Sequence, residues 1–331
     1  MCGILGVIGS FLDRPTEVER ALTILSHRGP DGAGTWSSPD NRVHLAHRRL
    51  SILDLSERGA QPMSDGSGRF VITYNGELYN YLELRAELQS LGHTFRTGTD
   101  TEVLLEAYKA WGEGCLQRFN GMFAFALYDT VQQRLFCARD RYGEKPFLFA
   151  AQLERFAFAS EYKALLALPG IAADYDEFRL LRGLHNASMG LDGDRQTVFN
   201  GIQQLLPAEA LVLDCRTLNH RIWRYWDLQP NPELAALSEA DAITRFRELL
   251  ADAVRIRVRS DVPVGSCLSG GLDSSAIVSL IRQQIHPEGE YHTFTGRFPG
   301  TAADEWRYAE PVIAASRVTS HVVEPTADGF A

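Results

Sequence analysis

Short apolar runs, rather than long periodic segments, dominate the first two hundred residues of the chain. Each run is rich in aromatic or β-branched residues, which is typical of buried strands. The predicted strands cover residues 70–74, 121–128, 134–138 and 147–149. Asn75-Gly76 follows the first strand as a turn signal. Leucines near helical spacing predict a helix that ends at Gly92, and a second helix is predicted over 101–110. Strands that cluster in this way predict an α+β layered domain.

The pattern changes after the segment Gln229-Pro230-Asn231-Pro232, which interrupts any regular element. An amphipathic helix, a short apolar strand, a Gly/Ser loop, a helix and another strand follow. These elements are predicted over residues 239–258, 262–268, 269–273, 274–284 and 291–298. Such an order predicts the start of a doubly wound α/β domain. We therefore expect a first domain over residues 2–215, a linker over 216–238 and a second domain over 239–331.

Charge and cysteine content narrow the function classes. The chain has 33 basic and 42 acidic residues, a net charge of -9, which argues against a protein that coats nucleic acid or is held on anionic lipid. No apolar run approaches the roughly 18 residues of a membrane span, and the start lacks the basic region of a secretory signal. Five cysteines, an odd number without C-x-x-C spacing, argue against a disulfide framework or a zinc site. We expect a cytoplasmic protein.

The first candidate site is Cys2, which directly follows the initiator methionine. Removal of Met1 would leave a thiol beside its own α-amine, whose ordinary pKa of about 7.7–8.0 suits a base near neutral pH. Gly3 would let a substrate approach the backbone closely. Cys2 on its own would favour an accident at a frayed terminus. Lipidation of Cys2 is disfavoured because no basic or second acylation signal accompanies it.

Several polar segments accompany Cys2, and taken singly each has an ordinary structural explanation as a turn, a helix cap or a solvated charge. Together they resemble the class II glutamine amidotransferases over about the first 215 residues, in that family's order and spacing. The matching segments are Met1-Cys2-Gly3-Ile4, Arg28-Gly29-Pro30-Asp31-Gly32, Arg49-Leu50-Ser51-Ile52, Asn75-Gly76-Glu77-Leu78-Tyr79-Asn80, Gly98-Thr99-Asp100, Gly121-Met122-Phe123-Ala124-Phe125 and Arg139-Asp140-Arg141-Tyr142-Gly143.

The resemblance implies an N-terminal-nucleophile glutaminase with a four-layer αββα fold. Cys2 would attack the side-chain amide of glutamine, release ammonia and form a thioester that water hydrolyses. The Asn75 side chain and the Gly76 N–H would form the oxyanion hole. Arg49 would hold the α-carboxylate of glutamine, Asp100 would accept its α-ammonium group, and Glu77 would contribute to the same site. His27, Arg28 and Asp31 would order the loop over the pocket.

A second candidate site is the loop Leu268-Ser269-Gly270-Gly271-Leu272-Asp273-Ser274-Ser275, between a predicted strand and a predicted helix. Two glycines let backbone N–H groups converge, the serines add donors, and a helix N-terminus attracts anions, so the loop suits a phosphate group. It is neither a Walker A motif nor G-x-G-x-x-G. Asp273 fits an anion site when a divalent cation bridges it to the phosphates. The alternative is a turn in which Asp273 or Ser274 caps the helix.

With Ser260-Asp261-Val262-Pro263-Val264-Gly265 before it, this loop resembles the PP-loop ATP pyrophosphatase domain of asparagine synthetases. The resemblance implies that ATP is bound by Leu268, Ser269, Gly270, Gly271, Asp273, Ser274 and Gly296, with Leu268 against the adenine and Mg²⁺ at Asp273. A class II glutaminase followed by such a domain resembles the glutamine-hydrolysing asparagine synthetase family. The implied substrates are glutamine, aspartate and ATP, the products include asparagine, AMP and pyrophosphate, and a homodimer is a family-level expectation.

The chain ends at Ala331, whereas the second domain of this family continues well beyond the matching point. We therefore expect a fragment or a truncated protein, with intact glutaminase chemistry, an incomplete synthetase site, and exposed apolar surface or an unpaired strand edge in the second domain. Two alternatives stay open. One is an amidotransferase that acts on another carboxylate, which the unusual segment 182–200 favours. The other is a chain limited to glutaminase activity or without catalysis.

Overall fold

The computed structural model describes residues 1–331 except 10–14, 186–192, 286 and 327–331. The segment Asn186–Gly190 and Asp192, part of the unusual stretch noted in the sequence, therefore lies outside the described residues. Two compact units are present, residues 1–229 and 230–331. The division falls inside the linker expected at 216–238.

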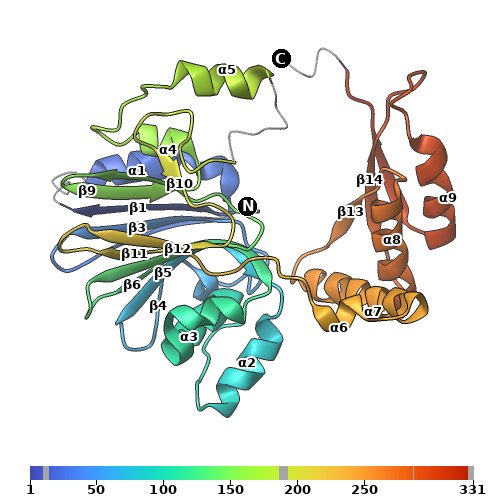
Figure 1. The fold of residues 1–331 in the computed structure, drawn as a ribbon, viewed down its shortest axis with the longest axis horizontal. Helices are drawn as coiled ribbons and strands as arrows, with labels where there is room; N and C mark the ends of the chain where they lie inside the picture. The colour runs from blue at the N-terminus through green and yellow to red at the C-terminus, as the bar shows by residue number, and fades with distance from the viewer. Residues whose placement is uncertain (10–14, 186–192, 286, 327–331) are drawn as a thin grey trace. The chain divides into compact units, whose positions relative to one another are not determined.

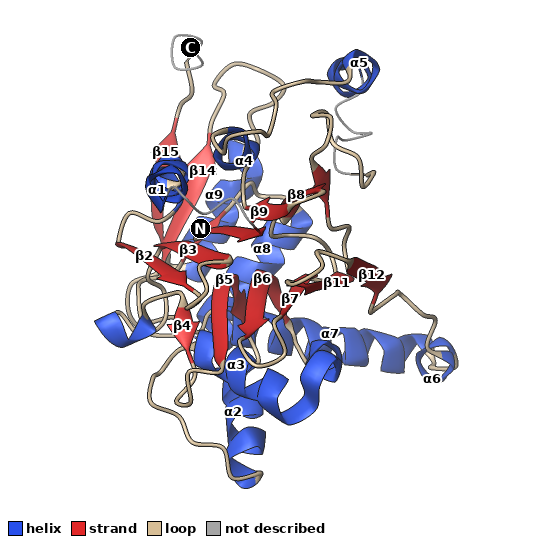
Figure 2. Ribbon diagram, turned by 90° about the vertical axis from the view of Figure 1, so that its left-hand side faces the viewer, coloured by secondary structure: helices blue, strands red, loops and turns tan. Residues whose placement is uncertain are grey.

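Two six-stranded sheets pack face to face in the first unit (Figures 1 and 2). The first sheet has the strand order β10 (Gln203–Gln204), β8 (Leu148–Gln152), β9 (Arg155–Ala159), β1 (Gly3–Gly9), β3 (Val43–Arg49), β2 (Gly32–Ser37). The second has the order β12 (His220–Arg224), β11 (Glu209–Asp214), β7 (Arg134–Arg139), β6 (Gly121–Asp129), β5 (Phe70–Leu78), β4 (Met63–Ser64). Because β12 pairs with β11, part of the expected linker is a strand of the first unit.

Helices cover the outer face of each sheet. Helices α1 (Pro15–Ile24) and α4 (Tyr162–Leu166) pack on the first sheet, and α2 (Tyr81–Ser90) and α3 (Asp100–Trp111) pack on the second (Figure 2). The described part of this unit also contains helix α5 (Glu177–His185) and 3₁₀ turns at Ser26–Arg28, Glu57–Gly59 and Gly112–Gln117. The unit thus has the four-layer αββα arrangement that the resemblance implied.

The alternation of side chains along the central strands explains this layering. In β1, Ile4 and Ile8 point into the core between the two sheets, whereas Leu5 and Val7 point toward α1 and α4. All seven residues of β1 are buried, because helices cover one face of the sheet and the second sheet covers the other. A continuous apolar run is therefore what the sequence of such a strand requires.

The expected turn at Asn75-Gly76 is wrong. Strand β5 continues to Leu78, and Asn75 and Gly76 pair with Ala124 and Phe123 of β6. A Cβ atom on Gly76 would lie 2.2 Å from the Met122 carbonyl oxygen, so the close approach of β6 requires glycine at this position. Close approach within a sheet, rather than chain reversal, therefore explains this glycine.

The second unit contains the predicted β–α–β segment and extends it by one helix and one strand. Helices α6 (Pro232–Ala235) and α7 (Glu239–Arg257) precede a parallel sheet of β13 (Gly265–Cys267), β14 (His292–Gly296) and β15 (Thr319–Val323), in that order. The crossovers are α8 (Leu272–Leu280), continued as a π-helix over Ile281–Ile285, and α9 (Trp306–Ser316). This parallel order is the one expected for the start of a PP-loop domain.

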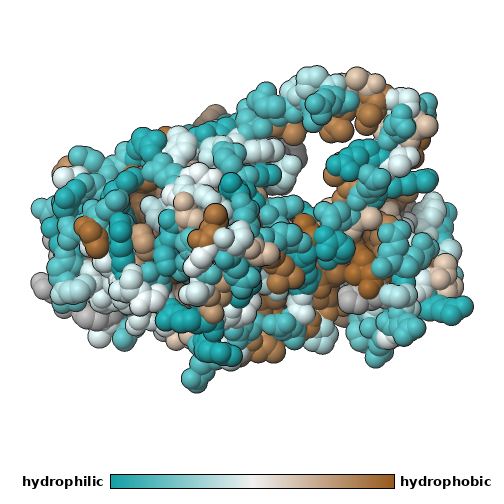
Figure 3. Space-filling view, turned by 90° about the horizontal axis from the view of Figure 1, so that it is seen from below, coloured by the Kyte–Doolittle hydropathy of each residue, from teal (hydrophilic) through white to brown (hydrophobic). Residues whose placement is uncertain are grey.

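Large apolar side chains are exposed on the second unit, as expected from the sequence. They are visible as brown surface on the right of Figure 3. The exposed residues of α6, α7 and the segment between them are Leu234, Leu237, Ile243, Phe246 and Leu249, and those of the sheet include Phe294 and Val323. Such a surface is typical of a face that is covered in a larger structure.

Candidate functional site

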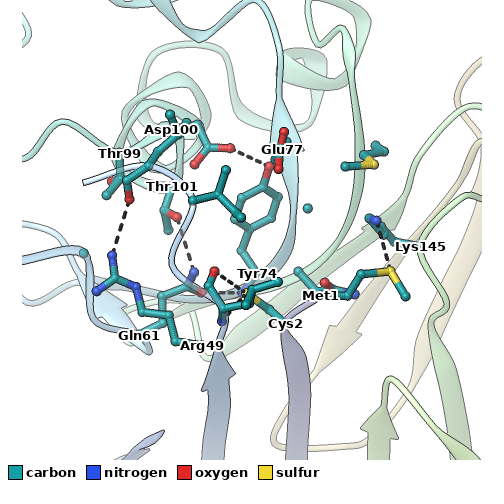
Figure 4. Close-up of a pocket in the computed structure, with 17 residues that line it drawn as sticks. Met1, Cys2, Arg49, Gln61, Tyr74, Glu77, Thr99, Asp100, Thr101 and Lys145 are labelled. Atoms are coloured by element: carbon teal, nitrogen blue, oxygen red, sulfur yellow. Dashed lines mark hydrogen bonds between the residues drawn. The ribbon is translucent and has the colours of Figure 1, made fainter. Parts of the chain in front are cut away.

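A pocket in the first unit brings together all six residues proposed from the sequence for this unit (Figure 4). Its lining comes from the two residues before β1, the end of β3 and the loop that follows it, the second half of β5, the start of α3, and single residues of β6 and of the segment after β7. The six residues are Cys2, Arg49, Asn75, Gly76, Glu77 and Asp100. Segments up to about a hundred residues apart in the sequence thus meet at one end of the paired sheets.

The thiol of Cys2 lies at the pocket wall against Leu50. The Leu50 N–H donates to Sγ at 3.4 Å, and Sγ lies 3.6 Å from the Leu50 carbonyl oxygen. Arg28 fixes the backbone of Cys2, because its Nε donates to the Cys2 carbonyl oxygen at 2.8 Å. Burial raises the pKa of the Cys2 thiol. A nearby base is therefore required if this sulfur is to act as a nucleophile near neutral pH.

Asn75 presents an unsatisfied donor in the same pocket as this sulfur. Asn75 is only 1% exposed, and its side-chain Nδ2 forms no hydrogen bond within the described part of the chain. An unpaired buried amide is costly, so it indicates a site that a ligand completes. The strand places Asn75 next to Gly76, whose backbone lines the same pocket. Two neighbouring donors of this kind can stabilise a developing oxyanion.

Two carboxylates on the other side of the pocket create negative potential. Asp100 accepts hydrogen bonds from the Tyr74 hydroxyl and the Leu78 N–H, both at 2.8 Å. Burial nevertheless raises the pKa of Asp100. Burial, and then the charge of Asp100, raise the pKa of Glu77 to about 7. A ligand with an ammonium group would relieve both effects, because an opposite charge favours the ionised carboxylates.

The raised pKa of Glu77 predicts how stability depends on pH. The unfolded carboxyl loses its proton above its ordinary pKa of 4.5, whereas the folded one keeps its proton up to about pH 7. This group therefore lowers the free energy of unfolding as pH rises between these values. We expect Glu77→Gln to have a higher Tm than the wild type at pH 8, and the same Tm below pH 4.5. Exposed Glu19→Gln, which removes the same charge, should show no such pH-dependent difference.

Arg49, the last residue of β3, is held by the loop that follows it. Its Nη1 donates to the Ser56 carbonyl at 2.7 Å, and its Nη2 donates to the carbonyls of Asp54 at 2.5 Å and Leu53 at 3.4 Å. The Asp54 carboxylate in turn accepts from the Gly98 N–H at 2.8 Å. These contacts fix the guanidinium group at the pocket and tie the loop to the segment before α3, consistent with a rigid cationic fork.

Among the pocket residues that sequence reasoning missed, three support the site: Tyr74, Gln61 and Lys145. Tyr74 supports Asp100, and Gln61 supports Tyr74, because Gln61 Oε1 accepts from the Tyr74 N–H at 2.7 Å. Lys145 is buried and its Nζ donates to Met1 Sδ at 3.3 Å. The only signal for Tyr74 was its place beside Asn75. Lys145 could have been suspected because it is one of only three lysines in the chain.

In the second unit, the Gly/Ser loop joins β13 to α8, as predicted. Gly271 is the N-cap of α8, and the Gly271 N–H donates to Ser269 Oγ at 3.2 Å. Gly270 has φ +87, and a Cβ atom there would lie 2.5 Å from the Ala309 amide nitrogen. Ser275 Oγ is buried and has no hydrogen-bond partner among the described residues. The loop is thus a compact turn at the N-terminus of a nine-residue helix, which fits an anionic group.

Leu268 differs from the loop residues that follow it because its side chain is buried. Its side chain is 1% exposed and packs against Val278 and Ala309, so it offers no surface to an adenine ring. The Leu268 side chain belongs to the small core, and a contact between Leu268 and the nucleotide stays a prediction. Gly296, at the end of β14, has open space around it. Asp273 and Ser274 lie in the first turn of α8. Among the described residues, no cluster of three or more His, Cys, Asp or Glu side chains could hold a metal.

Two family models match the chain in the order of its two units. The model described as a glutamine amidotransferase domain matches residues 1–226, and the model described as asparagine synthase matches residues 245–331. The chain belongs to the glutamine-hydrolysing asparagine synthetase family. The pocket residues therefore lie within the first matched domain, and the Gly/Ser loop lies within the second.

Two curated relatives illustrate how much of a family member this chain represents. Asparagine synthetase [glutamine-hydrolyzing] 3 of Bacillus subtilis is 39% identical over 305 residues, which are 89% of this chain and 48% of the relative. A putative asparagine synthetase [glutamine-hydrolyzing] 2 of Methanocaldococcus jannaschii is 36% identical over 340 residues, which are 97% of this chain and 64% of the relative. The chain thus spans about half to two thirds of the length of these relatives.

A solved structure supports the fold. The glutamine phosphoribosylpyrophosphate amidotransferase of B. subtilis, in complex with ADP and GMP, aligns with a TM-score of 0.51 at 16% identity and covers 98% of this chain and 81% of that chain. At this identity the likeness concerns the fold alone, and it agrees with an N-terminal-nucleophile glutaminase domain. Among the described residues, no helix combines the length and apolar character needed to cross a bilayer.

Proposed function

We propose that the first unit hydrolyses glutamine, with Cys2 as the nucleophile after removal of Met1. The observation that carries this proposal is the convergence on one pocket of a thiol, an unsatisfied amide donor, a cationic fork and two carboxylates. These are the groups needed to attack an amide, stabilise its oxyanion and bind both ends of an α-amino acid.

The steps follow from the positions of these groups. The α-amine of Cys2 takes the thiol proton, and the sulfur attacks the side-chain carbonyl of glutamine. Asn75 Nδ2 and the Gly76 N–H donate to the oxyanion, and ammonia departs with the proton that the amine returns. Water then hydrolyses the thioester and frees glutamate. Asp100 and Glu77 accept hydrogen bonds from the α-ammonium group, and the Arg49 guanidinium group binds the α-carboxylate.

We propose that the second unit uses ATP to adenylate aspartate, so that ammonia displaces AMP and forms asparagine. The asparagine synthase family uses ATP as a substrate. The fit of the loop supports this role, because Gly270 leaves no room for a side chain, Ser275 Oγ is unpaired, and α8 directs its N-terminus at the loop. Ser269, Gly270, Gly271 and Ser274 would bind the phosphates, with Gly296 nearby. Asp273 would hold Mg²⁺, which would offset phosphate charge.

Two measurements test the proposal. Mass spectrometry of the N-terminus should show that Met1 is absent, and glutamate should be released when glutamine alone is supplied. Addition of ATP and aspartate separates glutaminase activity from synthesis, which would yield asparagine, AMP and pyrophosphate. A retained Met1 together with no glutamate release would contradict the glutaminase assignment. Replacing aspartate with other carboxylates tests the acceptor.

Two further expectations belong to this proposal. A cytoplasmic location is supported by five free cysteines, three of them buried. A homodimer follows from the family resemblance, and light scattering would test it.

The conformation of Gly270 makes a sharp test of the ATP loop. We expect Gly270→Ala to weaken ATP binding at least about tenfold, because the new Cβ would push the loop away from Ala309 while the backbone holds a positive φ. Gly300→Ala is the matched control, since Gly300 has φ +78 but open space around its Cβ position. The control should keep the wild-type ATP affinity in calorimetry. Equal affinities of the two variants would contradict a role of this loop in ATP binding.

A further inference from the structure

Lys145 places a buried ammonium group against the first residue of the chain. The residue is 6% exposed, lines the same pocket as Cys2, and its Nζ donates to Met1 Sδ at 3.3 Å (Figure 4). A thioether is a weak acceptor, so it compensates poorly for the lost hydration of a cation. Among the described residues, no carboxylate forms an ion pair with Lys145 within 4.0 Å. Its charge is therefore available to act on neighbouring groups in the pocket.

A rigid turn holds Lys145 in this place. The carboxylate of Asp140, which is fully buried, accepts hydrogen bonds from the N–H groups of Tyr142, Glu144 and Lys145 at 3.0 to 3.1 Å. Arg139 Nε donates to the Lys145 carbonyl oxygen at 2.9 Å. The backbone on which the ammonium group is mounted is thus fixed from two sides, so its distance from Cys2 is set by the fold.

The other charges around the N-terminus are mostly negative, so a cation is needed to keep an amine there neutral. Arg28 approaches the Cys2 carbonyl, but its charge is paired with Glu161, which lies 2.8 Å from Arg28 Nη1. Besides the Cys2 thiol itself, the charged groups that face the N-terminus include Asp31, Glu77, Asp100 and Arg49. Three of these four are carboxylates, and negative charge favours the protonated form of an amine. Burial, and after it the charges of Arg28 and Lys145, act in the opposite direction and lower the pKa of the Met1 α-amine, which directly precedes Cys2 in the unprocessed chain.

We propose that Lys145 is a positioning residue whose fixed charge keeps the α-amine of mature Cys2 neutral, so that this amine can accept the thiol proton. The inference rests on the proposed glutaminase function. The proton moves from Sγ to the α-amine and then to the departing ammonia. Burial lowers the pKa of Lys145, but the nearby carboxylates of Glu77, Glu144 and Asp140 oppose this effect, and Lys145 keeps its own proton throughout. Removal of Met1 brings the titrating amine to the Cys2 nitrogen, on the side of the pocket where Lys145 lies (Figure 4).

The test compares Lys145→Met with Lys145→Arg, which retains the charge. Without the cation, the amine holds its proton to higher pH, so the acid limb of kcat/KM for glutamine should move up by about one pH unit in Lys145→Met. Lys145→Arg should restore the limb to within a few tenths of a unit. Lys109→Met is the matched control, because Lys109 pairs with Glu106 and Asp65 outside the pocket. Unchanged acid limbs in all three variants, with equal Tm values, would overturn the proposal.

A purely structural or substrate-binding role of Lys145 would give a different result. If Lys145 only offsets the charge of Glu77, Lys145→Met should change KM for glutamine while the acid limb stays in place, which would also overturn the proposal. If Lys145→Met lowers Tm by unfolding the protein, two other variants replace it. Lys145→Arg keeps the charge and should keep the acid limb of kcat/KM in place. Lys145→Gln is polar but neutral and should shift that limb to higher pH.

A second measurement needs no turnover. The rate of Cys2 alkylation by iodoacetamide follows the thiolate fraction, and the fixed charge should also favour the thiolate. Peptide mass spectrometry separates Cys2 from Cys267, which is exposed and serves as the internal reference. We expect the Cys2 profile of Lys145→Met to move to higher pH and the Cys267 profile to stay in place. If the Cys2 alkylation profile differs between the wild type and Lys145→Met, but the wild type releases no glutamate, only the glutaminase function is contradicted. Glutamate release with unmoved profiles would contradict this inference alone.

Discussion

Cys2→Ala is expected to lower the rate of glutamate release from glutamine by at least about 10⁴-fold, because it removes the only atom that can form the thioester. The variant retains the groups that bind the amino acid, so it should still bind glutamine. Arg49, Glu77 and Asp100 should be unaffected by the loss of Sγ, because the hydrogen bonds of this atom to described residues are those with Leu50. Glutamate release measured enzymatically, together with glutamine binding measured by calorimetry, checks both parts.

Cys267→Ala provides the matched control for the loss of a thiol. Cys267 is the exposed cysteine at the end of β13 in the second unit, outside the pocket. Its replacement should leave the rate of glutamate release unchanged. An undiminished rate in Cys2→Ala would remove the basis of the glutaminase proposal, whatever the second unit does.

The sequence predicted most elements of the first unit because buried strands have a strong local signature. The apolar runs at 121–128 and 134–138 became β6 and β7, and the predicted helices became α2 and α3. Asn75-Gly76 failed as a turn because dipeptide preference is local, whereas pairing with β6 is a long-range contact. Such contacts override the propensity of two residues.

The candidate site was predictable to the extent that its residues lie in recognisable motifs. Cys2, Arg49, Asn75 and Asp100 were found in this way, and the structure places them around one pocket. Tyr74 and Gln61 were not found, since a strand tyrosine and a loop glutamine carry no signal until the fold brings them to Asp100 and Thr101. Support for a site comes from tertiary contacts, which a linear pattern does not encode.

Asn75→Ala is expected to reduce kcat for glutamate release by about 10²–10³-fold, the usual loss when one oxyanion-hole donor is removed. The structural basis is the buried Nδ2, which forms no hydrogen bond in the described part of the chain and belongs to a residue that lines the same pocket as Cys2. An unpaired amide contributes little to the folded state, so the variant should be as stable as the wild type or slightly more stable. The KM for glutamine should change much less than kcat, because the donor acts on the charge that develops during attack.

A structural role of Asn75 would give the opposite pattern, with a lower Tm and little change in kcat. Asn75→Asp tests the same donor by charge, since it keeps the shape of the side chain but directs an acceptor at the oxyanion, and it should be at least as inactive as Asn75→Ala. Asn200→Ala is the control, because Asn200 Nδ2 donates to Asp174 at 2.9 Å at an exposed position outside the pocket. Wild-type kcat in Asn75→Ala would show that the oxyanion is stabilised elsewhere, and the donor set would then have to be sought among the backbone N–H groups around Gly76.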